Sequence, residues 1–228
     1  GAAEVLQMIG DTLVTLSPDQ KTVLPELAES WEMSEDGLTY TFHLKEGVTF
    51  CDGKPFAAAD VVGTMDRWLA PDAPNVSTWR AGEVDEITAQ DDLTVVYKLK
   101  VPSSNLLYQM ANFNFIMIDP DQAEALGDNF GVTAFNGTGP FCLESWSPRD
   151  QVVLKRHDGY TWGAPELGNP GPAKVDTVIW KIIPEEATLV ATIPAGEIDA
   201  SYSVPSWALA QFEADPTVQL LRPEASFR

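Results

Sequence analysis

The residue types that most often catalyse reactions or hold metals are sparse in this chain and lie far apart. There are two cysteines, Cys51 and Cys142, and two histidines, His43 and His157. No C-x-x-C pair, H-E-x-x-H helix or G-x-S-x-G turn occurs, so the spacings typical of structural zinc, metalloproteases and α/β-hydrolases are missing. We therefore expect no catalytic residue, no metal site and no cofactor.

Glycines and carboxylates also lack a catalytic pattern. Gly137 and Gly139 are followed by Pro140 and an expected strand, not by a helix whose N-terminus could bind phosphate. Four aspartates are spread over turns and helix starts, with no sign that two of them converge as an acid–base pair: Asp36, Asp52, Asp60 and Asp199. A secreted carbohydrate-active enzyme or binding module stays open as an alternative, and the enzyme would need two carboxylates roughly 5–10 Å apart.

The charge balance limits the kinds of partner. The chain has 14 Lys and Arg against 34 Asp and Glu, a formal net charge of −20. Such a surface repels phosphate backbones, so we expect no nucleic-acid partner. With 228 residues, 44% of them hydrophobic, the chain can bury a core. It contains no run of 18 apolar residues, so the sequence predicts no transmembrane span.

Residue periodicity predicts the elements between residues 39 and 69. The segment 39–44 alternates, with Tyr40, Phe42 and Leu44 on one side, which predicts a half-buried strand. Pro55 then leads into an expected helix, because apolar residues follow it at helical spacing. These residues are Val61, Met65, Trp68 and Leu69.

The remaining elements predict an α/β fold class of the mixed α+β kind. Two hairpins are expected, 84–89 with 93–100 and 141–146 with 152–156. From Lys174 on, the pattern alternates as β-α-β-α-β, which is typical of a parallel or mixed sheet with covering helices. The expected elements are strand 175–183, helix 185–193, strand 198–204, helix 205–214 and strand 218–221.

The stretch from Leu27 to Val62 holds the most specific motifs. It reads, in order, AESW, an acidic-Gly turn, TYTFHLKEGVTF, DGKPF and an A-x-DV helix start. This order closely resembles the signature of the family 5 extracytoplasmic solute-binding proteins, the peptide, nickel and opine receptors of ABC importers. Four later segments resemble the family in the same order: Gly137–Phe141, Asp158–Gly163, Ile182–Thr188 and Gly196–Asp199. The resemblance extends from about residue 12 to about residue 225 and covers nearly the whole chain.

The resemblance implies one lobe of a type II periplasmic-binding-protein-like fold. Residues 1–36 and 146–228 would form the larger subdomain of lobe I, and residues 37–145 a smaller inserted subdomain. Lobe II, the first strand of lobe I and any signal peptide are expected to lie outside this sequence.

In function, the resemblance implies a periplasmic substrate-binding component of an ABC transporter. It would capture a peptide-like solute between two lobes and deliver it to the membrane permease, acting as a monomer and not as an enzyme. An opine, an oligosaccharide or a metal chelate stays open as the ligand.

For the cysteines, the resemblance places Cys51 and Cys142 at strand ends in the same small subdomain. Because an oxidising periplasm permits disulfides, this favours a Cys51–Cys142 bridge. Two free buried thiols, or a metal or catalytic role for them, stay open as alternatives.

Six residues are candidates for contact with a ligand. Open α/β sheets bind ligands beyond the carboxyl ends of their strands, which selects Tyr202 and Ser203. The resemblance places Trp79 and the segment Asn112, Phe113, Asn114 near the cleft. We predict that Trp79, Asn114 and Tyr202 line one concave face. The alternatives are that Tyr202 packs under the following helix, that Phe113 belongs to the core and that Trp79 caps the inserted subdomain.

Overall fold

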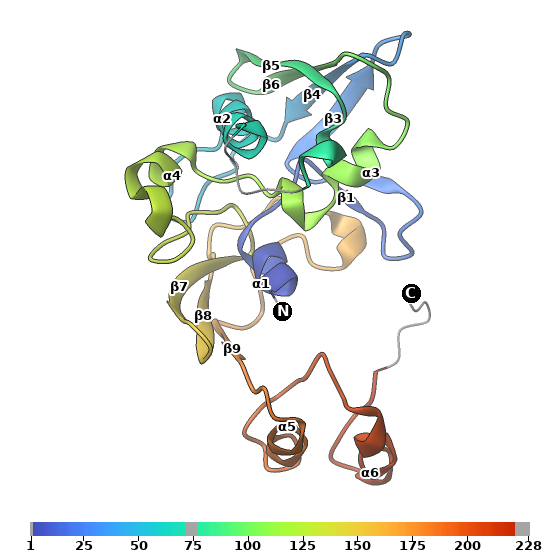
Figure 1. Ribbon diagram of the computed structural model, residues 1–228, viewed down its shortest axis with the longest axis vertical. Helices are drawn as coiled ribbons and strands as arrows, with labels where there is room; N and C mark the ends of the chain where they lie inside the picture. Colours follow the sequence, from blue (N-terminus) through green and yellow to red (C-terminus); the bar gives the residue numbers. More distant parts are fainter. Residues whose placement is uncertain (1, 72–76, 222–228) are drawn as a thin grey trace. The chain divides into compact units, whose positions relative to one another are not determined.

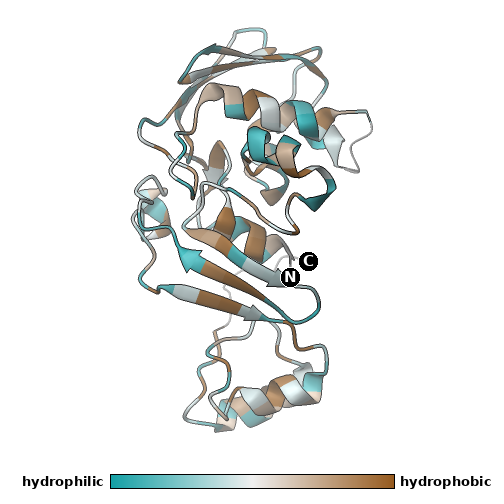
Figure 2. Cartoon of the chain, turned by 90° about the vertical axis from the view of Figure 1, so that its left-hand side faces the viewer, coloured by the Kyte–Doolittle hydropathy of each residue, from teal (hydrophilic) through white to brown (hydrophobic). Residues whose placement is uncertain are grey.

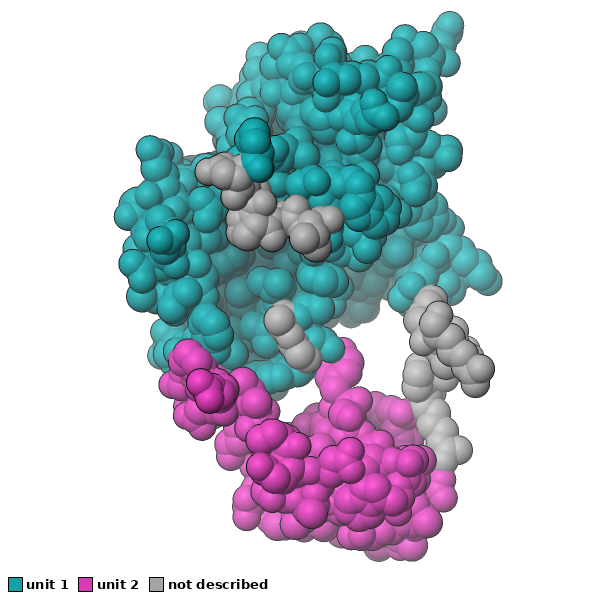
Figure 3. All heavy atoms as spheres, viewed as in Figure 1, with its two compact units in different colours: residues 1–146, 152–180 teal, residues 147–151, 181–228 magenta. Residues whose placement is uncertain are grey.

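The computed structural model describes residues 2–71 and 77–221 and divides the chain into two compact units. The first unit consists of residues 1–146 and 152–180, and the second of residues 147–151 and 181–228 (Figure 3). No helix in the described part of the chain combines the length and the apolarity needed to cross a bilayer.

A four-stranded antiparallel sheet is the centre of the first unit. Its strands are β3 (Ala28–Met33), β4 (Thr39–Leu44), β5 (Val84–Asp91) and β6 (Thr94–Leu99), in the order β3-β4-β6-β5 (Figure 1). In β4, the side chains of Tyr40, Phe42 and Leu44 are buried and those between them are half-buried. The alternation read from the sequence is therefore confirmed, since successive side chains of a strand point to opposite faces.

Helix α2 (Ala58–Leu69) packs against β5 and β6 and buries Val61 and Met65 in the core of this sheet (Figure 1). At its start, the Asp60 carboxylate accepts a hydrogen bond of 2.9 Å from the backbone N–H of Ala57, which satisfies one of the free donors of a helix N-terminus. Near its end, the Trp68 ring lies 4.6 Å from the ring of Phe115. The helix expected after Pro55 is confirmed.

A second, three-stranded sheet has the order β7-β8-β9, with β7 (Phe141–Ser147), β8 (Gln151–Arg156) and β9 (Thr177–Lys181). Helix α1 (Ala2–Ile9) supplies Ile9 to its core, beside Phe141 and Leu154. Each of these strands carries a short run of hydrophobic residues next to hydrophilic ones (Figure 2). Smaller elements complete the first unit: β1 (Val14–Leu16), β2 (Val23–Pro25), η1 (Thr78–Ala81), α3 (Leu106–Met110), η2 (Phe113–Phe115), α4 (Pro120–Leu126), η3 (Gly127–Asn129) and η4 (Pro165–Leu167).

The turn Gly137–Phe141 depends on two close backbone approaches to the end of α1. A Cβ atom on Gly137 would lie 1.9 Å from the carbonyl oxygen of Ile9, and one on Gly139 would lie 2.5 Å from the backbone nitrogen of Gly10. Only a residue without a side chain fits at either position.

The second unit has three short helices among its described residues. It contains α5 (Glu186–Thr192), η5 (Ser206–Ala208) and α6 (Leu209–Ala214) around a small core of Val190, Ala208 and Phe212.

The strands expected at 198–204 and 218–221 are not formed, and these two predictions are wrong. A strand needs a neighbouring strand to bond with, and neither segment has one among the described residues. The last part of the family resemblance, beyond residue 221, lies outside the described residues.

The subdomain boundaries expected within the lobe differ from the compact units. The boundary at residues 36–37 falls in the connection between β3 and β4, which are paired. The compact units divide the chain near residues 146–152 and 180–181 instead. The division into 1–36 with 146–228 and 37–145 stays a prediction.

Candidate ligand-binding site

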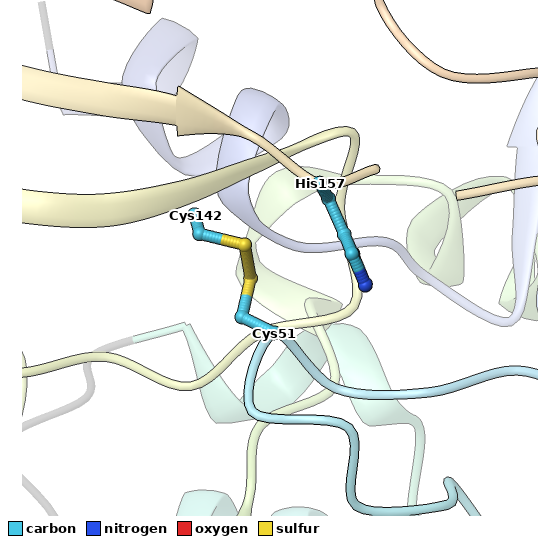
Figure 4. A group of neighbouring side chains, drawn as sticks. All are labelled: Cys51, Cys142 and His157. Carbon is cyan, nitrogen blue, oxygen red and sulfur yellow. A yellow bond between two sulfur atoms is a disulfide. The ribbon is translucent and has the colours of Figure 1, made fainter. Parts of the chain in front are cut away.

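Cys51 and Cys142 form a disulfide between residues 91 positions apart, with their Cα atoms separated by 5.8 Å (Figure 4). The bridge connects the loop after Val48–Phe50 to strand β7, and the Cys51 N–H also donates to the Gly137 carbonyl at 3.0 Å. The predicted pairing is confirmed, and the alternative of two free thiols is wrong.

His157 lies beside this disulfide (Figure 4). Within residues 2–71 and 77–221, Cys51, Cys142 and His157 are the one group of possible metal-binding side chains whose ligand atoms lie within 4.8 Å of each other. Thiolates bind metals, and the sulfurs of a disulfide are not thiolates. His157 is buried, and its Nδ1 is 3.1 Å from the Gly139 carbonyl oxygen. The group is therefore part of the protein framework.

The segment Asp158–Gly163 also belongs to the framework. Its Tyr160 hydroxyl and Trp162 indole donate to the buried carboxylate of Asp11, at 3.3 and 3.0 Å. Burial raises the pKa of Asp11 well above its usual range, and the nearby Glu26 carboxylate raises it further. These hydrogen-bond donors partly offset the free-energy cost of burying the carboxyl group. Asp11 is therefore a buried residue with a structural role.

Glu26 and Lys45 complete this internal cluster. The Glu26 carboxylate accepts hydrogen bonds from the hydroxyl and the backbone N–H of Thr12, at 2.8 and 3.1 Å. Burial raises the pKa of Glu26 and lowers the pKa of Lys45, whose ammonium donates to the Trp162 carbonyl at 2.7 Å. The cluster joins the residues that follow β2 and β4 to the 160–162 segment.

The lysine of the DGKPF motif has a structural role as well. The Lys54 ammonium contacts three carboxylates, Asp119 at 2.7 Å, Asp121 at 2.8 Å and Asp60 at 3.2 Å. Burial lowers the pKa of Lys54, but these hydrogen bonds outweigh burial and raise it overall. The contacts join the start of α2 to the start of α4.

Trp79 and the segment Asn112–Asn114 lie on elements that pack against one helix. Trp79 belongs to η1 and is 64% exposed. The Asn112 side chain accepts from the Asn114 N–H at 3.2 Å and so caps η2, in which Phe113 and Asn114 are half-buried. Both η1 and η2 pack against α3. The first unit therefore brings these two candidate segments to the same helix.

Tyr202 and Ser203 belong to the second unit. Tyr202 is 82% exposed, so it does not pack under the following helix. Ser203 is also exposed, and its N–H and carbonyl both bond the Ser201 hydroxyl, at 3.3 and 2.9 Å. That Tyr202 shares one face with Trp79 and Asn114 stays a prediction.

Two residues that sequence reasoning missed lie beside Trp79. The Arg80 guanidinium carbon is 4.7 Å from the centre of the Trp79 ring, and one of its terminal nitrogens donates to the Gln109 side chain of α3 at 2.5 Å. An arginine next to a candidate aromatic residue was a usable signal, since guanidinium groups stack on aromatic faces. Nothing in the local sequence around Gln109 indicated a role, because its contact with Arg80 depends on how α3 packs.

Comparison with known proteins places this geometry in context. The sequence model of the bacterial extracellular solute-binding proteins, family 5 (middle part), matches residues 22–227. The chain is 33% identical over 196 residues to the glutathione-binding protein GsiB of Escherichia coli O1:K1. The aligned stretch covers 86% of this chain and 36% of GsiB. The chain therefore spans little more than a third of the length of this curated relative.

Two solved structures have the same mixed α/β fold. The binding protein AgaA of A. tumefaciens R10, in complex with agropinic acid, is similar at a TM-score of 0.83 and 27% sequence identity. This match covers 93% of this chain and 41% of the AgaA chain. The ABC transporter-associated periplasmic binding protein DppA of Helicobacter pylori, in complex with the peptide STSA, is similar at a TM-score of 0.76 and 28% sequence identity. This match covers 92% of this chain and 43% of the DppA chain. These relatives are named as binding proteins and not as enzymes.

Proposed function

The chain belongs to family 5 of the bacterial extracellular solute-binding proteins, and on that premise we propose that it is part of a receptor that captures a peptide-like solute for an ABC importer. The observation that carries this proposal is the family match over residues 22–227. The receptor would act in the periplasm as a monomer and hand its solute to the membrane permease.

A peptide-like ligand suits the exposed residues of the first unit. Trp79 offers a large apolar face for stacking, and Asn114 has both a donor and an acceptor for the amide groups of a peptide. Two of the relatives are named for peptide-like ligands, glutathione and the peptide STSA. An opine is the second candidate, because the similar protein AgaA is in complex with agropinic acid.

Mechanistically, capture would depend on the closure of two lobes around a hinge, as in other periplasmic binding proteins. The residues that would contact the solute are Trp79, Asn112, Phe113, Asn114, Tyr202 and Ser203. Closure would cover aromatic surface that is exposed here, at Trp79 and Tyr202.

The test uses the full-length protein purified under native conditions. Native mass spectrometry would identify any retained solute, and calorimetry would then measure di-, tri- and tetrapeptides, opines, oligosaccharides and metal chelates. We expect short peptides to bind with micromolar affinity or better. Trp79→Ala is expected to weaken binding at least tenfold, whereas Trp146→Ala, at another exposed tryptophan of the first unit, leaves it unchanged. Turnover of a chromogenic glycoside, or no binding of any peptide or opine, would contradict the proposal.

A further inference from the structure

The Arg80 guanidinium is held in place on two sides. Its carbon lies 4.7 Å from the centre of the exposed Trp79 ring, and one terminal nitrogen donates to Gln109 at 2.5 Å. Arg80 itself is half-buried, and its Nε is buried without a hydrogen-bond partner among the described residues. A long, flexible side chain is thus ordered next to the candidate site before any solute binds.

The charge of Arg80 has no acidic partner among the described residues. Two other partly buried basic side chains of the first unit do have one: Lys54 contacts three aspartates, and Arg156 contacts Asp158 and Asp176. The partners of Arg80 are a neutral amide and an aromatic face. Because a half-buried charge is costly unless an opposite charge lies nearby, this arrangement is incomplete within the described protein.

We propose that Arg80 binds a carboxylate of the solute, next to Trp79, and so selects anionic peptide-like solutes. This inference rests on the proposed function and narrows its substrate class. The two terminal nitrogens of a guanidinium carry N–H donors that match the oxygens of a carboxylate, and in Arg80 these are the nitrogens that could meet a solute, since the Nε is buried. The Trp79 face would pack against the apolar part of the same solute.

The strongly acidic protein surface does not rule out an anionic solute. The net charge of −20 opposes the approach of an anion, but exposed charges are screened beyond about 8 Å at physiological salt. At contact distance the ordered guanidinium decides the interaction. The carboxylate could belong to a peptide C-terminus or to an opine, and the experiment separates the two sources.

The test measures calorimetric binding to the full-length protein with matched ligand pairs. One pair is a short peptide as its free acid and as its C-terminal amide, and the other is an opine and its methyl ester. We expect the wild-type protein to prefer the free acid in at least one pair by at least about tenfold, the range of a hydrogen bond to a charged group. The pair that shows the preference identifies the source of the carboxylate.

Two variants assign the preference to Arg80. Arg80→Gln is expected to lower affinity for the free acid to that for the neutral partner and to leave the neutral partner's affinity within about twofold. Arg67→Gln is the matched control, since Arg67 also lies over an aromatic ring, Phe130 at 5.4 Å, but is exposed on α2. This variant should keep the full preference for the free acid.

Each outcome separates this inference from the proposed function. If no peptide or opine binds to the wild-type protein, the proposed function fails. If both members of each pair bind equally, or if Arg80→Gln weakens both alike, the inference is wrong and the proposed function stands. The wild-type comparison needs no variant. Arg80→Lys serves if the glutamine variant does not fold: it keeps the charge but not the planar set of N–H donors, so the free-acid preference should fall, and an undiminished preference would contradict the inference. Loss of the free-acid preference in Arg67→Gln would also overturn the inference.

Discussion

Trp162 donates a hydrogen bond of 3.0 Å to the buried carboxylate of Asp11, across 151 positions of the sequence. This bond fastens the segment after α1 to the loop that follows β8. Tyr160 reinforces it with a second bond to the same carboxylate, at 3.3 Å. Tyr160 and Trp162 of the family-like segment Asp158–Gly163 are therefore buried and stabilise the first unit.

The first prediction concerns pH and Asp11. Burial raises the pKa of Asp11, so the folded state holds a proton that the unfolded chain releases near pH 4. The resulting stability is fully present below that pH and is lost as pH rises through the raised pKa. Asp11→Asn removes this loss, and we expect the variant to gain stability relative to the wild type as pH increases from 4 to 9. Urea unfolding of both proteins across this range is the measurement, and parallel curves would contradict the prediction.

The second prediction concerns Gly139. The nearest atoms to a methyl group there would all be backbone atoms, including the Gly10 nitrogen at 2.5 Å. Backbone atoms cannot relieve a clash by changing rotamer, as a side chain can. We expect Gly139→Ala to destabilise the protein by about 3 kcal/mol, at the upper end of overpacking effects. Gly171→Ala is the control, because a Cβ at Gly171 has free space around it. Thermal unfolding of both variants checks this, and equal melting temperatures would refute the close approach.

The third prediction concerns the disulfide. It closes a loop between residues 91 positions apart, so its removal gives the unfolded chain more freedom. We expect replacement of both Cys51 and Cys142 by serine to cost about 2–4 kcal/mol in denaturant unfolding. Wild-type protein with dithiothreitol should behave like the double variant. Alkylation of both thiols without prior reduction would show that the bridge is absent.

The fourth prediction concerns Lys54. Lys54→Met removes the cation that neutralises Asp60 and Asp119, whose side chains are largely buried. We expect a loss of about 1–3 kcal/mol, less than for a fully buried pair because Lys54 is partly exposed. Lys98→Met, which breaks an exposed pair with Glu86, should cost less than about 1 kcal/mol. Chemical denaturation compares the two variants, and similar losses would show that burial of the carboxylates has no effect.

Part of the candidate site was within reach of sequence reasoning. The family resemblance pointed to Trp79 and Asn112–Asn114, and the structure places both segments against α3. The position of Arg80 next to Trp79 was a usable signal, but its proposed role also depends on a contact with Gln109 and on the absence of a described acidic neighbour. Such properties belong to the packing of separate segments and leave no trace in local residue spacing.

The sequence by itself determined the elements whose pattern is local, and the tertiary structure decided the rest. Strand β4 and helix α2 follow from alternation and helical spacing, since a few neighbouring residues decide which face is apolar. Segments 198–204 and 218–221 have strand-like residues but form no strand, because a strand requires a partner elsewhere in the chain. The bond from Trp162 to Asp11 likewise depends on the path of the chain between them, because folding alone brings residues so far apart in sequence within 3.0 Å.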